Sequence, residues 1–269
     1  MKVWKRCTNC GQRGHFHKEC EEPKISIGII CFRYDFFKTS LEFLLVHKKY
    51  TFAYTDFIRG NYEYSNINEL IELIKGISPT ERERIMTIKK FQILWDDIWT
   101  SSAVVCTTEK FKKDYDIAEA KFNLLTSVGI HGTTFNEIIQ NNPSVNNGPK
   151  WEFPKGKRDI NESNIKCACR EFQEETDISP DEYEIRFEFS PIIDEFVGNN
   201  GINYKYIYFV GQSHDLMFVP KINEKNKHQI HEIGDIGWFS LENVLEKINK
   251  PGPQLNQLFE KLQKTYIFN

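Results

Sequence analysis

The chain of 269 residues lacks the features that would assign it to several common classes. No apolar run reaches the ~20 residues of a membrane-spanning helix, and none follows the Met-Lys start, so we expect a cytoplasmic protein with no membrane partner. A formal net charge of -3 gives no overall attraction to nucleic acid, so such binding would need local basic clusters. There is no internal repeat or low-complexity segment. What remains, with 40% hydrophobic residues, is a globular chain with a substantial core.

The seven cysteines do not form the even, regularly spaced set typical of a disulfide framework. Four of them, namely Cys31, Cys106, Cys167 and Cys169, are scattered through apolar patterns and are expected to be reduced thiols. The others lie in CTNCGQRGHFHKEC with the spacing C-x2-C-x4-H-x4-C, which groups Cys7, Cys10, His15 and Cys20. Three thiolates and one imidazole complete the tetrahedral shell of Zn²⁺, so the pattern predicts a structural zinc site.

This motif resembles the CCHC zinc knuckle, and the resemblance implies binding of single-stranded RNA or DNA. We expect residues 1–22 to form the knuckle and Glu21-Glu22-Pro23 to link it to a domain over residues 24–269. Phe16 is available to stack on a base. Arg13 and Lys18 are available to contact phosphates, and Lys2, Lys5 and Arg6 add to the local positive charge. A protein partner for the knuckle is the alternative.

The remaining chain alternates between strand and helix patterns, which indicates an α/β fold. ISIGIICFRY and LEFLLVHKK predict a hairpin, and further strands are expected at 151–153, 183–189, 204–210 and before 239. Helical periodicity covers 67–77, 78–99, 108–128 and 133–140, and it returns at 240–248 and 253–266. Ser78-Pro79-Thr80-Glu81 is a capping box. We therefore expect a mostly helical insertion at about 55–148.

A helix from Asn164 to Thr176, with Ser163 as its N-cap, carries three carboxylates away from its apolar face. Residues three and four positions apart are neighbours on a helix, so Glu171, Glu174 and Glu175 crowd together and repel one another. Oxygen ligands of this kind suit Mg²⁺ or Mn²⁺. The alternative is a solvated acidic face.

The spacing from Gly156 through Glu162 to Arg170-Glu171-Phe172-Gln173-Glu174-Glu175 resembles the Nudix box of the Nudix hydrolase superfamily. Asp177-Ile178 stands where the family usually has glycine and an aliphatic residue. The resemblance implies a Nudix α/β/α sandwich and hydrolysis of a nucleoside diphosphate linked to another group.

The resemblance also implies roles for individual residues. Glu171, Glu174, Glu175 and the carbonyl of Gly156 would hold Mg²⁺ or Mn²⁺, and Glu162 and Arg170 would orient the carboxylates. A further carboxylate often precedes the tryptophan of a late strand, so Glu232, six residues before Trp238, is a candidate general base or extra ligand. The alternative for Glu232 is a plain surface residue.

The segment WEFPKGK resembles the stretch that opens the box in mRNA-decapping Nudix enzymes, and it makes Lys155 and Lys157 candidate substrate contacts. SIGIICFR, VHKKYTFAY, FQILWDDIW and YKYIYF, with the long insertion, resemble the decapping enzymes of large DNA viruses, asfarvirus-like or mimivirus-like. This implies cleavage of the cap of mRNA into 7-methylguanosine diphosphate and 5′-monophosphate RNA, by a viral protein in the host cytoplasm. The alternatives are a hydrolase of diphosphoinositol polyphosphates or dinucleoside polyphosphates, and an RNA-binding protein with an inactive Nudix domain.

Two stretches of the insertion interleave lysine with phenylalanine, at Lys89-Lys90-Phe91 and Lys110-Phe111-Lys112-Lys113. Such a surface would suit an RNA backbone. Amphipathic helices with phenylalanines in the core are the alternative.

Overall fold

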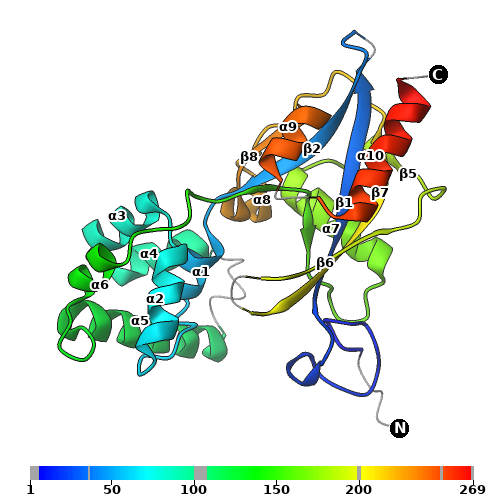
Figure 1. The fold of residues 1–269 in the computed structure, drawn as a ribbon. Coiled ribbons are helices and arrows are strands. Elements are labelled where there is room, and N and C mark those ends of the chain that lie inside the picture. The colour runs from blue at the N-terminus through cyan, green and yellow to red at the C-terminus, as the bar shows by residue number, and fades with distance from the viewer. Residues whose placement is uncertain (1–5, 36, 100–107, 199–200, 249–250, 268–269) are drawn as a thin grey trace. The chain divides into compact units, whose positions relative to one another are not determined.

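The computed structural model describes residues 6–35, 37–99, 108–198, 201–248 and 251–267 (Figure 1). The contacts divide the chain into two compact units. One unit contains the described residues of Met1–His47, Trp151–Gln229 and Asp235–Asn269, and the other contains those of Lys48–Lys150 and Ile230–Gly234. Each unit has a hydrophobic core, so each is described by itself.

The first unit is built on a mixed sheet with β1 (Lys24–Asp35) at its centre. β1 pairs antiparallel with β2 (Ser40–Lys48) on one side and parallel with β7 (Asn203–Ser213) on the other. In the described chain the main strand order is β3-β2-β1-β7-β5, while β4 pairs with β1, β6 with β7 and β8 with β2. The bounds of the other strands are β3 Trp151–Glu152, β4 Lys155–Gly156, β5 Tyr183–Ile185, β6 Ile192–Val197 and β8 Ile233–Ser240.

Alternation along β1 gives the sheet two buried faces, because successive side chains of a strand point to opposite sides. Ile30 and Phe32 share a core with side chains of α9 (Leu241–Lys247) and α10 (Pro253–Tyr266). The opposite face packs against α7 (Asn164–Thr176). The unit therefore has the helix, sheet and helix layers of the expected Nudix fold (Figure 1).

Helix α7 begins and ends where the sequence predicts. The Ser163 hydroxyl oxygen accepts a hydrogen bond from the Lys166 amide at 3.4 Å, as an N-cap should. The helix ends at Asp177, whose φ of 60° is the left-handed conformation that usually favours glycine. The Asp177 carboxylate accepts hydrogen bonds from the side chains of Asn223 at 2.7 Å and Asn226 at 3.0 Å. These contacts explain an aspartate at this position, since glycine could not form them.

The second unit is helical and has a core of its own around Tyr54, Phe57 and Trp95. Its helices are α1 Phe52–Ile58, α2 Ile67–Gly76, α3 Pro79–Thr87, α4 Phe91–Ile98, α5 Glu109–Val128 and α6 Phe135–Asn141. The predicted capping box is present, because the Ser78 amide donates to Glu81 Oε2 at 3.0 Å and the Glu81 amide to Ser78 Oγ at 3.4 Å. No helix in the described ranges is long and apolar enough to cross a membrane.

The prediction of one helix over 78–99 is wrong, because the chain turns between α3 and α4. Arg84 on α3 donates to Asp97 on α4 at 2.6 Å. In a straight helix these positions would lie ~20 Å apart, so the bond requires the break. The sequence patterns also missed α1, α8 (Lys227–Glu232) and β6, and they made the strand at 183–189 too long.

The two stretches of the insertion that interleave lysine with phenylalanine lie at the starts of amphipathic helices, with the phenylalanines packed against the core. Phe91 is buried in the helical core, and Phe111 packs edge-on to Trp95 and Trp99 with ring centroids 5.6 and 5.5 Å apart. The neighbouring lysines are exposed, at Lys89, Lys90, Lys110, Lys112 and Lys113. Phe91 is therefore not available to stack on a base.

We predict that Phe172→Ala lowers the free energy of unfolding of the sheet unit by about 3–5 kcal/mol, because it leaves a cavity under α7. Phe172 is 0% exposed and its ring centroid lies 4.8 Å from that of Tyr183. Urea denaturation followed by near-ultraviolet circular dichroism measures the change. The control is Phe187→Ala, since Phe187 is 77% exposed and its loss should cost less than about 0.5 kcal/mol. Equal effects of the two changes would contradict the packing.

Candidate active site

Gly156 ends the short strand β4, and the predicted box starts from it. β4 pairs with β1, with Gly156 opposite Ile27. A side chain at position 156 would collide with the carboxylate of Glu171 on α7. Glycine lets the backbone of β4 approach this carboxylate closely, and a larger residue would displace the Glu171 side chain.

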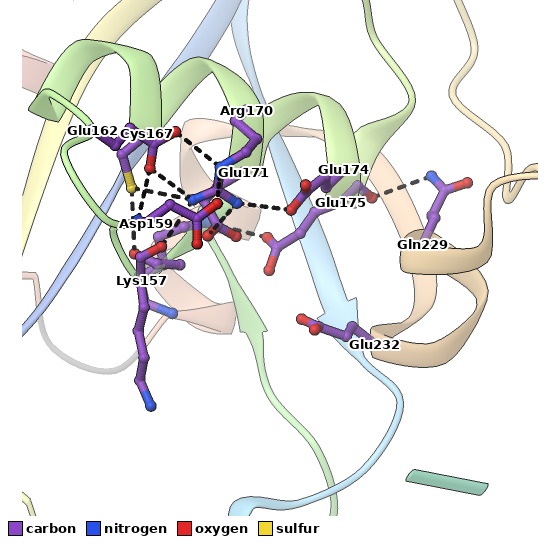
Figure 2. A network of polar contacts seen from close by, with 12 residues as sticks. Lys157, Asp159, Glu162, Cys167, Arg170, Glu171, Glu174, Glu175, Gln229 and Glu232 are labelled. Carbon is purple, nitrogen blue, oxygen red and sulfur yellow. Dashed lines mark hydrogen bonds and ion pairs between the residues drawn. The ribbon is translucent and has the colours of Figure 1, made fainter. Parts of the chain in front are cut away.

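Arg170 is the cation that joins the loop after Gly156 to α7 (Figure 2). Its Nε donates to Glu162 Oε1 at 2.9 Å, and its Nη2 to Glu162 Oε2 at 3.0 Å. Nη1 donates to Glu171 Oε1 at 2.8 Å and to Glu174 Oε2 at 2.9 Å. Nη2 also donates to the carbonyl of Lys157 at 2.9 Å. The structure thus brings Glu162, Arg170, Glu171 and Glu174 together as one network.

Burial changes the acidity of this network. Burial raises the pKa of Glu171 to about 8, with Arg170 opposing the shift and the charge of Glu175 adding to it. The pKa of Glu162 is lowered, chiefly by its hydrogen bonds from Arg170. The pKa of Arg170 is raised, because these bonds outweigh its own burial. The guanidinium therefore stabilises the charge of Glu162, while Glu171 stays hard to ionise.

Glu175 and Lys155 are both fixed by near neighbours. Glu175 is buried, and its Oε2 accepts a hydrogen bond from the Lys155 amide at 3.1 Å. The Lys155 ammonium lies 2.6 Å from a carboxylate oxygen of Glu152 and 4.7 Å from the centroid of the Tyr206 ring. Lys157, by contrast, has an exposed side chain. Of the two lysines predicted to contact substrate, Lys157 is the more accessible.

Helix α8 is attached to the end of the box helix through amides that sequence patterns did not single out. The Gln229 side-chain amide donates to the Glu175 carbonyl at 3.2 Å, and Asn226 donates to the Glu174 carbonyl at 3.3 Å. Glu232 is the last residue of α8, and its side chain is 61% exposed. Its Oε2 lies 3.5 Å from Lys48 Nζ. No sequence signal distinguishes Gln229 or Asn226 from other polar residues.

The carboxylates of the box fit a divalent cation by charge and by ligand type. Three carboxylates contact the single guanidinium of Arg170, those of Glu162, Glu171 and Glu174, and the carboxylate of Glu175 belongs to the same helix. The bonds from Arg170 use one oxygen each of Glu171 and Glu174. Hard cations prefer such oxygen ligands, and the backbone at Gly156 lies against the same cluster.

The predicted knuckle residues also come together. The ligand atoms of the four residues all lie within 4.8 Å of one another, in the set Cys7, Cys10, His15 and Cys20. Among the described residues this is the one group of acidic, cysteine and histidine side chains already arranged to share an ion. Burial opposes ionisation of Cys20, yet hydrogen bonds from Asn9 and His15 lower its pKa to about 6. Three sulfur donors and one nitrogen fit Zn²⁺.

The knuckle presents its basic and aromatic side chains to solvent. Phe16 is 66% exposed, and Arg6, Arg13 and Lys18 are also exposed. Lys2 and Lys5, which add to the predicted charge, lie outside the described residues, as does Cys106. Cys31 and Cys167 are free and buried, as expected of reduced core thiols, whereas Cys169 is only partly buried.

Comparison with known proteins gives matches to one family. The NUDIX domain model matches residues 138–259. The mRNA-decapping protein g5R of African swine fever virus (isolate Pig/Kenya/KEN-50/1950) is 33% identical over 82% of this chain and 87% of its own length. A protein of Acanthamoeba polyphaga mimivirus is 28% identical over 97% of this chain and 93% of its own. A solved C. elegans Ap4A hydrolase is 13% identical, covering 88% of this chain and 96% of its own with a TM-score of 0.44.

We predict that, without divalent cations, the burial of Glu171 lowers the stability of the sheet unit as the pH rises from 5 to 8. Below its unfolded pKa of about 4.5, the Glu171 carboxyl is neutral in both the folded and the unfolded protein. As the pH rises above that value the carboxyl ionises first in the unfolded protein, so its contribution to stability falls until the pH has passed its folded pKa of about 8. Glu171→Gln cannot ionise, so it should gain about 2–4 kcal/mol relative to the parent between pH 5 and 8.

Thermal denaturation in the presence of a chelator, at both pH values, measures this difference. Glu184→Gln is the matched control, because Glu184 is exposed on β5 of the same unit. If the thermal stabilities of the parent and of Glu171→Gln change in parallel with pH, Glu171 is not buried as a neutral acid.

Proposed function

Since this chain belongs to the Nudix family, and is homologous over most of its length to an mRNA-decapping protein of African swine fever virus, we propose that it cleaves the cap of mRNA. The reaction is hydrolysis of the cap pyrophosphate into 7-methylguanosine diphosphate and 5′-monophosphate RNA. The observation that carries the proposal is the carboxylate cluster around Arg170, which stands against the backbone of Gly156. Capped mRNA in a host cytoplasm is the substrate.

The residues of the box would hold the divalent cation. Glu171, Glu174 and Glu175, with the carbonyl of Gly156, supply anionic and neutral oxygens from a strand end and one helix face. A divalent cation held there would neutralise the charge of the diphosphate and lower the pKa of a water molecule bound to it. For Glu171 and Glu174 to offer both carboxylate oxygens to the cation, Arg170 must release its bonds to them. Its two bonds to Glu162 would then keep the guanidinium in place.

The other groups have supporting roles. Lys157 is exposed in the loop after Gly156 and would contact a phosphate of the substrate. Lys155 contributes mainly its backbone amide, which orients Glu175, because its ammonium is paired with Glu152. The proton of the attacking water goes to Glu171 or to Glu232. A carboxyl accepts a proton only when it is ionised, so a cation bound beside Glu171 would have to lower its raised pKa for this residue to be the base.

The knuckle adds affinity for the RNA chain in this proposal. A structural Zn²⁺ held by its four ligands keeps the module folded, since so short a segment has no core apart from its metal shell. The exposed Phe16 is placed to stack on an unpaired base, and Arg13 and Lys18 are placed to contact phosphates. The exposed lysines of the helical insertion offer further phosphate contacts without base stacking by Phe91.

The function is tested with RNA carrying a labelled cap, assayed beside labelled dinucleoside polyphosphates and diphosphoinositol polyphosphates in Mg²⁺ or Mn²⁺. We predict labelled 7-methylguanosine diphosphate from the parent. Glu174→Gln and Glu175→Gln should retain less than about a tenth of the rate, because an amide does not replace an anionic ligand of a hard cation. Glu184→Gln is the control.

Each other outcome identifies an alternative. Cleavage of the small substrates alone would identify a small-nucleotide or inositol hydrolase, and RNA binding without any cleavage would identify an inactive Nudix domain. Glu232→Gln belongs in the same assay. If Glu232→Gln cleaves at the rate of the parent, Glu232 is a plain surface residue and Glu171 is the remaining candidate base.

We predict that Phe16→Ala, Arg13→Ala and Lys18→Ala, combined, raise KM for capped RNA of some tens of nucleotides but not for a cap dinucleotide. Each lost phosphate contact should reduce the slope of log K against log salt by about 0.7. Steady-state kinetics at two salt concentrations measure both effects. If the ratio of the two KM values is unchanged, the knuckle binds a protein partner instead.

A further inference from the structure

Arg158 is a buried arginine that joins the knuckle to the box loop, defined here as residues 157–162 between Gly156 and α7. Its side chain is 6% exposed. Nη1 donates to the backbone carbonyl of Asn9 at 3.1 Å, and Nη2 donates to the side-chain oxygen of Asn164, the first residue of α7. One side chain thus contacts the knuckle, the loop that carries it and the start of the box helix.

The knuckle end of this contact is itself fixed. Asn9 is 6% exposed, and its Oδ1 accepts a hydrogen bond from the Ile25 amide on β1 at 2.9 Å. Its Nδ2 donates to the Pro23 carbonyl at 2.9 Å and to Cys20 Sγ at 3.2 Å. Residues 21–23 are therefore not a free linker, because Asn9 ties the knuckle to the strand that follows.

The guanidinium of Arg158 lies against the turn of the knuckle that follows Cys10. A Cβ atom at Gly11 would stand 2.5 Å from Arg158 Nη1, and Gly11 has a φ of 77°. The Gly11 amide donates to the carbonyl of Cys7 at 2.8 Å, which closes this turn. The contact consequently depends on the turn that the metal ligands Cys7 and Cys10 define.

Charge explains why an arginine occupies this position. Within the described ranges, no carboxylate lies within ion-pair distance of Arg158, and its buried Nε has no hydrogen-bond partner. A buried charge without a counter-charge is unfavourable. Three thiolates around Zn²⁺ carry a net charge of about -1, so a zinc-loaded knuckle supplies the missing negative charge. Loss of the ion would leave Arg158 beside a turn that is no longer held in shape.

The opposite side of the box loop is bound to the carboxylate cluster. The Lys157 carbonyl accepts from Arg170 at 2.9 Å, and the Asp159 amide donates to Glu162 Oε2 at 2.9 Å. The loop is therefore held on one side by Arg170 and on the other by Arg158. Gly156, whose carbonyl is a proposed ligand of the divalent cation, lies only two residues before Arg158.

We propose that Arg158 is a positioning residue that couples zinc binding in the knuckle to the placement of the box loop, so that cleavage depends on zinc even for a substrate without an RNA chain. The coupling rests on the proposed diphosphatase function. It differs from the role of Phe16, Arg13 and Lys18, because those side chains act only on the RNA chain.

The test compares the parent, Arg158→Met, Arg158→Lys and Lys24→Met, each with and without zinc, on a 7-methylguanosine cap dinucleotide. Zinc is removed by a chelator, its content is measured by mass spectrometry, and Mn²⁺ is then restored. Lys24→Met is the matched control, since Lys24 is an exposed basic residue that follows the knuckle in the same unit.

In the parent, zinc removal should lower kcat on the order of 10-fold with little change in KM. Arg158→Met with zinc bound should show the same loss, and zinc removal should then add nothing. Arg158→Lys should restore part of the rate, and Lys24→Met should behave as the parent. An equal loss on zinc removal in the parent and in Arg158→Met would overturn the proposal, because the effect would then not pass through Arg158.

Hydrogen–deuterium exchange of the amides of residues 157–162 provides a readout that does not need activity. Exchange should become faster on zinc removal in the parent and should already be fast in Arg158→Met. If the exchange rate in the parent does not change when zinc is removed, the coupling is overturned. A parent that cleaves no cap dinucleotide while its exchange still responds to zinc would instead refute the decapping function and keep the coupling.

Discussion

The arrangement of the site depends on a single guanidinium among carboxylates. Arg170 donates to Glu162, Glu171 and Glu174 and also to the carbonyl of Lys157. A planar guanidinium has five N–H donors in a fixed fork, whereas an ammonium has three on a flexible stem, so arginine suits this position better than lysine. Because its partners come from both the loop and α7, this one side chain fixes the loop relative to the helix.

The same arrangement buries carboxyl groups of α7 close to the guanidinium. Glu171 is held against Gly156, where burial raises its pKa to about 8. Glu175 is buried too, and its Oε2 accepts a hydrogen bond from the Lys155 amide. Clusters that are costly without their ion are common at functional sites, where local stability is given up for binding or catalysis. Glu171 and Glu175 on α7 are thus not plain solvated carboxylates, which supports the proposed cation site.

The knuckle and the box are parts of one polar framework in the sheet unit. Asn9 bonds both to β1 and, through its carbonyl, to Arg158 of the box loop. The loop of residues 157–162 therefore contacts both clusters, through Arg158 to the knuckle and through the Lys157 carbonyl to Arg170. The sulfur and nitrogen donors of one cluster and the oxygen donors of the other would let each select its own ion, since soft thiolates favour Zn²⁺ and hard carboxylates favour Mg²⁺ or Mn²⁺.

The sequence by itself determined the features that depend on neighbouring residues. The spacing of the knuckle ligands, the apolar period of α7 and its Ser163 cap all act over short distances along the chain, so they can be recognised without a fold. Asp177 was recognised as a helix end in the same way, but its hydrogen bonds to Asn223 and Asn226 were not.

Only the tertiary structure decided which distant residues meet. Arg158 and Asn9 are 149 positions apart, and Gln229 and Glu175 are 54 apart. The break between α3 and α4 likewise follows from packing and from the Arg84 to Asp97 bond, against a helical period that continues through it. Such contacts depend on how the folded chain brings separate segments together. Local propensity carries no information about them, because it describes each segment in isolation.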